Sequence, residues 1–325
     1  MMEPAETVHK PVLLNEVLAV LDPVAGKTYV DGTFGAGGYT KAILEKSPCI
    51  VYGIDRDPDA VDRAQALRKT YPRFHIIEGN FADMDHLMSE TVHPKVDGVV
   101  LDLGVSSPQL DQADRGFSFQ KDGPLDMRME KSGVTAAQVV NTYSEERLAH
   151  IIWSYGDEKK SKQIAKRIVN DRVKTPFTST LQLAKVIHET LGHKDPRKID
   201  PATKTFQALR IFVNEEMGSL KKGLRAAEKI LNPGGHLIVV SFHSLEDREV
   251  KTFLQTRSGK KSNPSRYDPR PNTPDSLPST FQLIDKKSMA PSMKEVRDNP
   301  RSRSAKLRWA LRTTAPAWPF EEDLS

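Results

Sequence analysis

Three acidic residues in the first third of the chain each stand directly after a short apolar run. They are Asp31, Asp55 and Asp102, and the runs cover 28–30, 50–54 and 96–101. The carboxyl ends of parallel strands meet at one rim of an open α/β sheet, where ligands bind. A carboxylate at that rim can attract a cation or accept hydrogen bonds from ribose hydroxyls. The alternative is that each aspartate only caps the helix after its strand.

A glycine-rich turn follows the first of these aspartates. The segment reads Asp31-x-x-x-Gly35-x-Gly37, with Gly38 next. It does not match the GxGxxG fingerprint of dinucleotide-binding folds, and a carboxylate beside the turn would repel a pyrophosphate. A carboxylate suits the cationic amine and sulfonium of S-adenosylmethionine (SAM) instead. The spacing resembles the loop of class I SAM-dependent methyltransferases, with Thr33 in place of their first glycine.

The elements that must position these residues alternate between strand and helix. Strands are expected at 28–31, 50–54, 74–77, 96–101 and 236–241, and helices at 12–21, at 58–69 and through 43–44. A terminal antiparallel pair is expected from 281–284 and 307–311, after a proline-rich loop over 263–280. This alternation predicts an α/β fold with a doubly wound, mostly parallel sheet.

The pattern changes after about residue 110. Residues 111–133 are polar and glycine-rich, whereas 135–192 carry apolar residues at helical spacing, with Gly192 as a C-cap. We therefore predict an all-helical domain at 113–202, inserted into a sheet domain made of 1–112 and 203–325. A single long helix is expected over 206–231, ended by the turn at 232–235.

Composition and charge restrict the possible functions. The chain has 325 residues, of which 38% are hydrophobic, enough for a packed core. No run approaches the roughly 18 apolar residues of a membrane span, and the single Cys49 excludes an internal disulfide or a cysteine-based zinc site. We expect a soluble chain in a reducing compartment. Residues 251–312 contain 15 Lys or Arg and 5 Asp or Glu, which indicates a polyanionic partner such as nucleic acid or a plain solvated surface.

Several longer stretches together resemble one family, the bacterial small-subunit rRNA cytosine-N4 methyltransferases (RsmH, formerly MraW). The matching blocks are collinear and cover nearly the whole chain. They are HKPVLLNEVL (9–18), DGTFGAGGYTKAIL (31–44), GIDRDPDA (53–60), LDLGVSSPQLDQADRGFSFQKDGPLDMRM (101–129), PATKTFQALRIFVNEE (201–216), NPGGHLIVVSFHSLEDREVK (232–251) and NPRSRSAKLR (299–308).

The resemblance implies a class I SAM-dependent methyltransferase domain with an inserted helical domain for substrate recognition. It implies SAM as cofactor and methylation of a decoding-region cytidine in 16S rRNA, within the assembled or assembling small subunit of the bacterial cytoplasm. A mitochondrial homologue is the less favoured variant. The implied cofactor contacts are Gly37, Gly38, Tyr39, Asp55, Phe81, Asp102 and Gln109. The family usually has histidine where Tyr39 stands, which matters only if the contact uses the ring.

The chemistry needs a group that accepts a hydrogen bond from the poorly nucleophilic cytosine amine. Asp102 is the candidate because it begins the polar stretch after the fourth strand, although it is equally a candidate cofactor contact. A flipped-out cytosine could stack on Phe242 and bind His243; the alternative is that Phe242 is core and His243 caps the next helix. Arg301 and Arg303 are expected on one strand face, where they would contact RNA phosphates.

Other sequence features leave alternatives open. Asp126 and Arg128 belong either to a loop that shapes the substrate site or to an internal ion pair. No full ligand set surrounds His243, so no metal site is expected. The competing functions are a nicotinamide-dependent oxidoreductase, a non-catalytic RNA assembly factor that holds SAM structurally, and a methyltransferase of DNA cytosine or protein.

Overall fold

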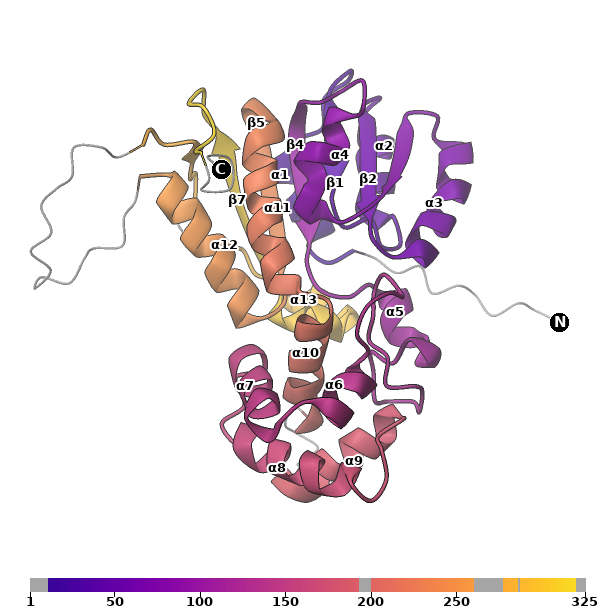
Figure 1. Cartoon of the computed structure of the whole chain (residues 1–325). Coiled ribbons are helices and arrows are strands. Elements are labelled where there is room, and N and C mark those ends of the chain that lie inside the picture. The colour runs from indigo at the N-terminus through magenta and orange to yellow at the C-terminus, as the bar shows by residue number, and fades with distance from the viewer. Residues whose placement is uncertain (1–10, 193–199, 260–276, 286, 320–325) are drawn as a thin grey trace, which may run out of the picture. The chain divides into compact units, whose positions relative to one another are not determined.

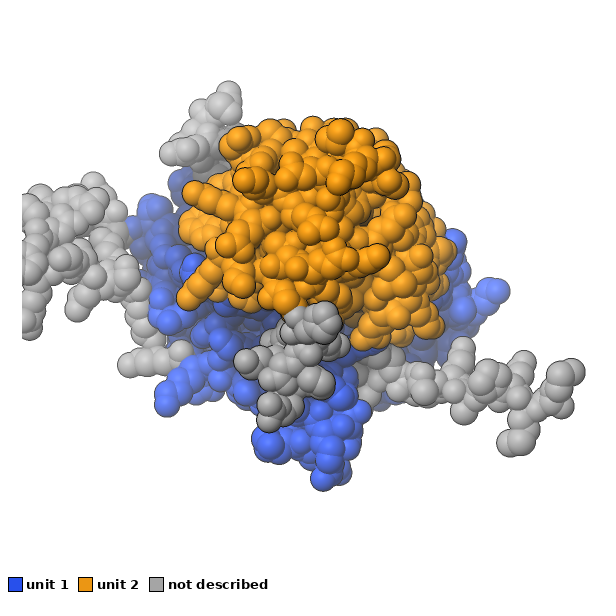
Figure 2. All heavy atoms as spheres, turned by 90° about the horizontal axis from the view of Figure 1, so that it is seen from below, with its two compact units in different colours: residues 1–104, 218–325 blue, residues 105–217 orange. Residues whose placement is uncertain are grey.

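A computed structural model describes residues 11–192, 200–259, 277–285 and 287–319 (Figure 1). Most of the expected proline-rich loop, 263–276, lies outside these residues. The chain divides into two compact units, which Figure 2 colours separately. The sheet unit comprises 1–104 and 218–325, and the helical unit comprises 105–217. None of the described helices is long and apolar enough to cross a lipid bilayer.

The sheet unit is built on seven strands in the order β3-β2-β1-β4-β5-β7-β6. They are β1 (Thr28–Asp31), β2 (Ile50–Asp55), β3 (Phe74–Glu78), β4 (Val96–Asp102), β5 (Leu231–Ser241), β6 (Phe281–Gln282) and β7 (Lys306–Arg312). The first five run parallel, and β7 pairs antiparallel with both β5 and β6. The predicted doubly wound α/β fold and its terminal antiparallel pair are confirmed.

The strand order reverses between β1 and β4. From β1 the chain proceeds outward through β2 to β3, and it then returns to place β4 on the other side of β1. Ligands of doubly wound sheets bind at such a reversal, beyond the carboxyl ends of the strands. The fold therefore brings the ends of β1, β2 and β4 together at one rim.

Most helices of the sheet unit bury apolar residues. They are α1 (Leu14–Leu21), α2 (Gly38–Lys46), α3 (Pro58–Thr70), α4 (Met84–Ser89), α11 (Glu216–Ile230, from Gly218 onward), α12 (Ser244–Arg257) and α13 (Met293–Asp298), with short 3-10 turns η1 (Phe81–Asp83) and η3 (Pro300–Ser304). Of these helices, α13 has no buried residue. One core packs α1, α2 and α3 onto a single face, where Val17, Ile43 and Ala64 meet strand residues such as Val51 and Val100.

The helical unit has a separate apolar core. Its elements are α5 (Ser107–Asp111), η2 (Ala113–Arg115), α6 (Ala136–Thr142), α7 (Glu145–Gly156), α8 (Ser161–Arg172), α9 (Thr180–Leu191) and α10 (Ala202–Val213). The unit extends beyond the predicted 113–202 at both ends. At one end Val105 and Leu110 pack against this core, and at the other Phe206 and Leu209 of α10 belong to it.

The single helix expected over 206–231 is wrong, because α10 and α11 are separate helices. Asn214 stops the first: its buried side chain donates to the carbonyl of Met127 at 2.7 Å and accepts from the amide of Met129 at 2.8 Å. Glu215 then adopts a left-handed φ of 48°, which a continuous helix does not allow. The apolar spacing continues across the break, so periodicity alone does not reveal it.

The turn expected at 232–235 lies inside β5. Pairing with β4 passes from Val96–Leu231 to Gly98–His236, so the extra residues of β5 form a bulge rather than ending the strand. Gly234 has a φ of 81° there, which favours glycine.

Candidate functional site

Asp31, at the end of β1, holds the glycine-rich turn in place. Its carboxylate is fully buried and accepts hydrogen bonds from the amide of Thr33 at 3.3 Å and from the amide and hydroxyl of Thr40 at 3.2 and 2.7 Å. Burial raises the pKa of Asp31 to about 6, although these hydrogen bonds act against the increase. Asp31 therefore shapes the turn and adds negative potential beneath it.

The turn itself needs glycine at two successive positions. Gly37 has a φ of 78°, and a Cβ there would lie 2.7 Å from the Phe34 ring. A Cβ on Gly38 would lie 2.3 Å from the Cγ of Pro11. Only glycine therefore lets the backbone of this turn pack so closely against Phe34 and Pro11.

Asp55, at the end of β2, is oriented by two backbone amides. One carboxylate oxygen accepts from Gly35 at 2.7 Å and the other from Asp57 at 2.9 Å. Partial burial raises the pKa of Asp55. A carboxylate has about four acceptor positions, so both oxygens can still bind ribose hydroxyls while the turn holds them still.

Asp102, at the end of β4, is the least satisfied of the three acids. Its Oδ1 is buried and has no hydrogen-bond partner within the described parts of the chain. Burial raises the pKa of Asp102 well above its usual range, and the neighbouring carboxylates of Asp31 and Glu246 add to the increase. A buried acceptor without a donor is costly, and such groups are common where a ligand supplies the missing partner.

Thr33 ties the first loop to this third acid. Its hydroxyl accepts a hydrogen bond from the Asp102 amide at 2.6 Å. From the spacing of the loop alone, Thr33 is only a replacement for the first glycine. Its role could not be found from sequence, because the contact joins residues far apart in the chain.

Tyr39 turns its side chain away from the loop. The ring is 3% exposed and packs in the core with α1, and its hydroxyl donates to the carbonyl of Val12. Only the backbone of Tyr39 remains available at the turn. The Tyr39 ring therefore does not replace a histidine ring that would contact the cofactor.

The ring of Phe81 packs against helix α11. A Cβ on Gly223 would lie 2.3 Å from this ring, so the helix backbone approaches it closely. Asn80 fixes the turn η1 by accepting from the Ala82 amide at 3.0 Å and donating to Ser219 at 3.0 Å. Phe81 is therefore held at the end of β3.

Gln109 belongs to the helical unit, unlike the other predicted cofactor contacts. Its side-chain oxygen accepts from the Ser106 amide at 3.0 Å, which caps α5. The side chain of Gln109 is therefore used within its own helical turn. The same unit holds Asp126 and Arg128, which form the internal ion pair with contacts of 2.8 and 2.9 Å.

Phe242 and His243 follow β5 and have structural partners. His243 is the N-cap of α12, where its Nδ1 accepts from the Glu246 amide at 3.4 Å, and Phe242 packs partly buried against the core. Glu246 accepts from the amides of both residues at 2.8 and 3.3 Å. The packing and capping alternative therefore describes their contacts, and a role in binding cytosine stays a prediction.

The C-terminal basic residues do not form one cluster. Arg301 and Arg303 are exposed on the 3-10 turn η3, so the expectation that they share a strand face is wrong. Arg308 and Lys306 of β7 instead bind Asp247 at 2.7 and 2.9 Å. Although burial acts to raise the pKa of Asp247, these two cations lower it.

Comparison with known proteins gives a consistent result over the chain. A family model described as the MraW methylase family matches residues 6–313. The ribosomal RNA small subunit methyltransferase H of Hyphomonas neptunium is 54% identical over 314 residues, covering 97% of this chain and 91% of that protein. The protein of the same name from Paramagnetospirillum magneticum is 54% identical over 311 residues, covering 95% and 97%.

Among solved structures, similarity is weak. A putative rRNA methylase from Clostridium thermocellum aligns over 95% of this chain and 99% of its own, with 11% identity and a TM-score of 0.41. The fold assignment here therefore depends on the strand order itself.

Proposed function

Because the chain belongs to the MraW methylase family, we propose that it methylates the N4 amine of a decoding-region cytidine in small-subunit rRNA. Membership in a methylase family implies SAM as the methyl donor. The observation that supports the reaction best is the buried Oδ1 of Asp102 at the end of β4, which has no hydrogen-bond partner among the described residues. The relatives are bacterial, so we infer a bacterial cytoplasmic enzyme.

The residues at the rim fit SAM. The backbone of 37–39 would line the methionine portion. Asp55 would accept the ribose hydroxyls, and Phe81 would flank the adenine. The carboxylates of Asp31 and Asp102 suit a bound cation. Burial disfavours their ionised forms and raises both pKa values, and a nearby positive charge would stabilise the ionised forms. When bound, SAM supplies an electrophilic methyl group.

Asp102 would act on the cytidine amine. Its Oδ1 can accept a hydrogen bond from the amine and so orient the nitrogen lone pair. After transfer the nitrogen is cationic and must lose a proton. A carboxylate with a raised pKa is a better proton acceptor than an ordinary aspartate, so the same Oδ1 can take that proton. Positioning and proton removal then depend on one atom.

Binding of rRNA would involve both units. Arg301 and Arg303 are exposed and suited to phosphate contacts, and we assign substrate recognition to the helical unit. Phe242 and His243 remain candidates for contact with the target base, although both already have structural partners.

Tritium transfer from labelled SAM tests this proposal. The substrates compared are assembled small subunits, naked rRNA, DNA and bulk protein, and the labelled nucleoside is identified by mass spectrometry. We expect N4-methylated cytidine in small-subunit rRNA. Binding of SAM without transfer to any RNA would contradict the proposal and favour an assembly factor, whereas label in DNA or protein would change the substrate class.

A further inference from the structure

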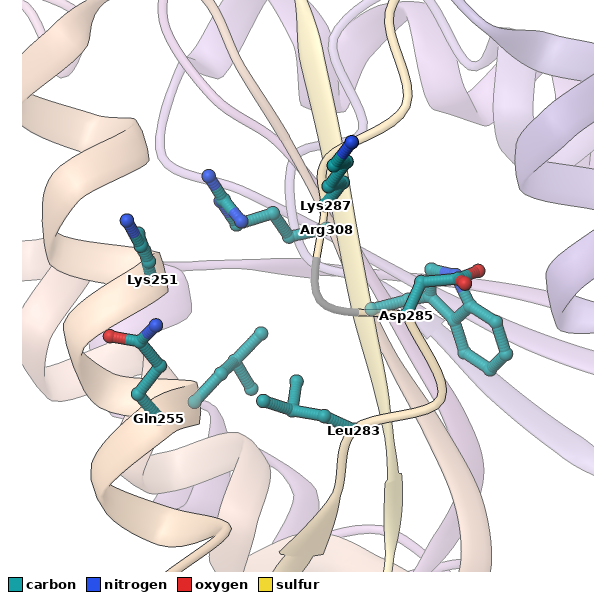
Figure 3. A pocket seen from close by; sticks show the side chains of 8 residues that line it. Lys251, Gln255, Leu283, Asp285, Lys287 and Arg308 are labelled. Atoms are coloured by element: carbon teal, nitrogen blue, oxygen red, sulfur yellow. The ribbon is translucent and has the colours of Figure 1, made fainter. Parts of the chain in front are cut away.

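A pocket lies within the sheet unit between helix α12, the residues Leu283, Asp285 and Lys287, and strand β7 (Figure 3). It is lined by Lys251, Leu254 and Gln255 of α12, by Leu283, Asp285 and Lys287, and by Arg308 and Trp309 of β7. None of these residues belongs to the rim formed by the ends of β1, β2 and β4. Arg308 is the residue that pairs with Asp247.

The pocket exists because β6 ends early. Gln282 pairs with Leu311, and the next contact on that side of β7 is the bridge between Met289 and Leu307. Six residues of the chain, 283–288, separate these two contacts on one side, whereas three residues, 308–310, separate them on β7. The described residues Leu283, Asp285 and Lys287 border the space beside the strand.

Positive charge enters this space from all three sides. Lys251 and Lys287 make no hydrogen bond or ion pair with any described residue, and Arg308 uses only its Nε, which donates to Asp247. The terminal nitrogens of Arg308 therefore keep their donors. The one acidic residue of the lining, Asp285, points away from Lys251 and Arg308 in Figure 3.

Asp247 fixes the direction of the arginine. It stands in the first turn of α12, is 9% exposed, and holds Arg308 at 2.7 Å and Lys306 at 2.9 Å. The side chain of Arg308 is 13% exposed. A guanidinium oriented in advance loses less side-chain freedom when it binds an anion.

We propose that this pocket binds a backbone phosphate of the RNA substrate. The proposal extends the function proposed above, since the expected polyanion is rRNA. Three cations suit a phosphate, and the apolar side chains of Leu254 and Leu283 offer a surface for the adjoining ribose. Such contacts position RNA without reading its sequence.

The double variant Lys251→Gln with Lys287→Gln tests the pocket. Its affinity for a transcript of small-subunit rRNA is measured by fluorescence anisotropy at several salt concentrations. We expect binding about tenfold weaker at low salt and a salt slope reduced by about 0.7 to 0.9, the value of one phosphate contact. SAM affinity, measured by calorimetry, stays unchanged, because neither lysine lies at the rim.

Matched controls distinguish the effect of the pocket lysines on RNA affinity from the effect of removing two positive charges elsewhere on the surface. Lys46→Gln with Lys69→Gln removes two exposed lysines of α2 and α3 in the same unit and should leave RNA affinity and salt slope near the wild-type values. Lys251→Arg with Lys287→Arg keeps the charge and should retain binding.

Three outcomes overturn the pocket proposal. The first is a pocket variant that binds RNA like the control pair, and the second is a salt slope that does not change. The third is weaker binding to assembled subunits with unchanged binding to naked rRNA, which would assign the pocket to a ribosomal protein. Methyl transfer by the wild-type chain is measured alongside, so failure of the methyltransferase function is seen separately.

Discussion

Asp102 ends strand β4, and Asp247 lies in the first turn of the helix after the neighbouring strand β5, but their surroundings are opposite. Asp102 has one buried oxygen without a partner and a pKa raised by burial and by nearby carboxylates. Asp247 binds two cations, which lower its pKa against the effect of burial. Ion pairing makes Asp247 part of the scaffold, whereas the missing partner at Asp102 leaves a place for a ligand. The position of a carboxylate in the fold therefore indicates function only when its partners are known.

The largest effects are expected when each of these two acids is replaced by its amide. Asp102→Asn should lower the rate of methyl transfer by roughly a hundredfold, because the amide is a weaker acceptor and cannot take the proton. Its thermal unfolding temperature should not fall, since an unpaired buried charge is removed. Asp247→Asn should instead lower the unfolding temperature and weaken RNA binding through Arg308. Similar kinetic losses in both variants would refute the contrast.

Asp55 is intermediate between these two acids, because each of its carboxylate oxygens accepts one hydrogen bond from a backbone amide. Asp55→Ala should weaken SAM binding by about tenfold to a hundredfold, the range for charge-assisted hydrogen bonds, because the ribose contact and the anchor of Gly35 are both lost. Calorimetry measures the change. Asp62→Ala, on the exposed side of α3, is the matched control and should bind SAM normally. Unchanged SAM affinity in Asp55→Ala would remove this acid from the site.

Arg301 and Arg303 are the exposed cations of the turn η3. Arg301→Ala with Arg303→Ala should weaken binding to rRNA severalfold, with a smaller salt slope, and should leave SAM affinity alone. Filter binding and calorimetry provide the two measurements. Equal loss of both affinities would show that these arginines support the fold of the sheet unit.

Stability should depend on pH in opposite directions for the two kinds of acid. The folded pKa of Asp247 is lowered, so its stabilising contribution is present above the unfolded value of about 3.9 and is lost as the pH falls through the folded value. The folded pKa of Asp31 is raised to about 6, so its contribution to stability increases as the pH falls from 7 toward 4. Urea unfolding from about pH 7 to pH 2 should show both effects: Asp31→Asn loses the pH dependence between about 7 and 4, and Asp247→Asn loses the pH dependence below about 4. The same slope in both variants would contradict the assignment.

The smallest effect is expected at Tyr39. Tyr39→Phe removes the hydrogen bond to Val12 and should cost about 1 kcal/mol of folding stability. SAM affinity should not change, because the ring lies in the core. A clear loss of SAM affinity would mean that the hydroxyl, as a replacement for the family's histidine, acts on the cofactor.

Local patterns predicted much of the molecule. The family resemblance, the parallel sheet and the strand-end aspartates at one rim are confirmed, because apolar runs and short turns are encoded over a few residues. The interruption between α10 and α11 was missed because Asn214 acts through Met127 and Met129, which lie far away in sequence. The bulge in β5 depends on its pairing with β4 and not on its own residues.

The chemistry of the charged residues was harder to predict. Nothing in the sequence near Arg308 or Lys306 shows that Asp247 binds them. The same limitation applies to the unpartnered oxygen of Asp102 and to the hydroxyl of Thr33 that fixes its backbone. Spacing identifies which residue types reach a rim, whereas only tertiary contacts show which of them are already satisfied.

The most direct test of the central claim is the pH dependence of single-turnover methyl transfer to small-subunit rRNA at saturating SAM. If Asp102 must be ionised to accept the cytidine amine, the rate should rise with pH through an inflection well above about 3.9, the usual aspartate value, because the folded pKa is raised. Asp102→Asn should be slow and should lack that inflection. An inflection that persists in Asp102→Asn, or a rate equal to that of the wild type, would contradict the account.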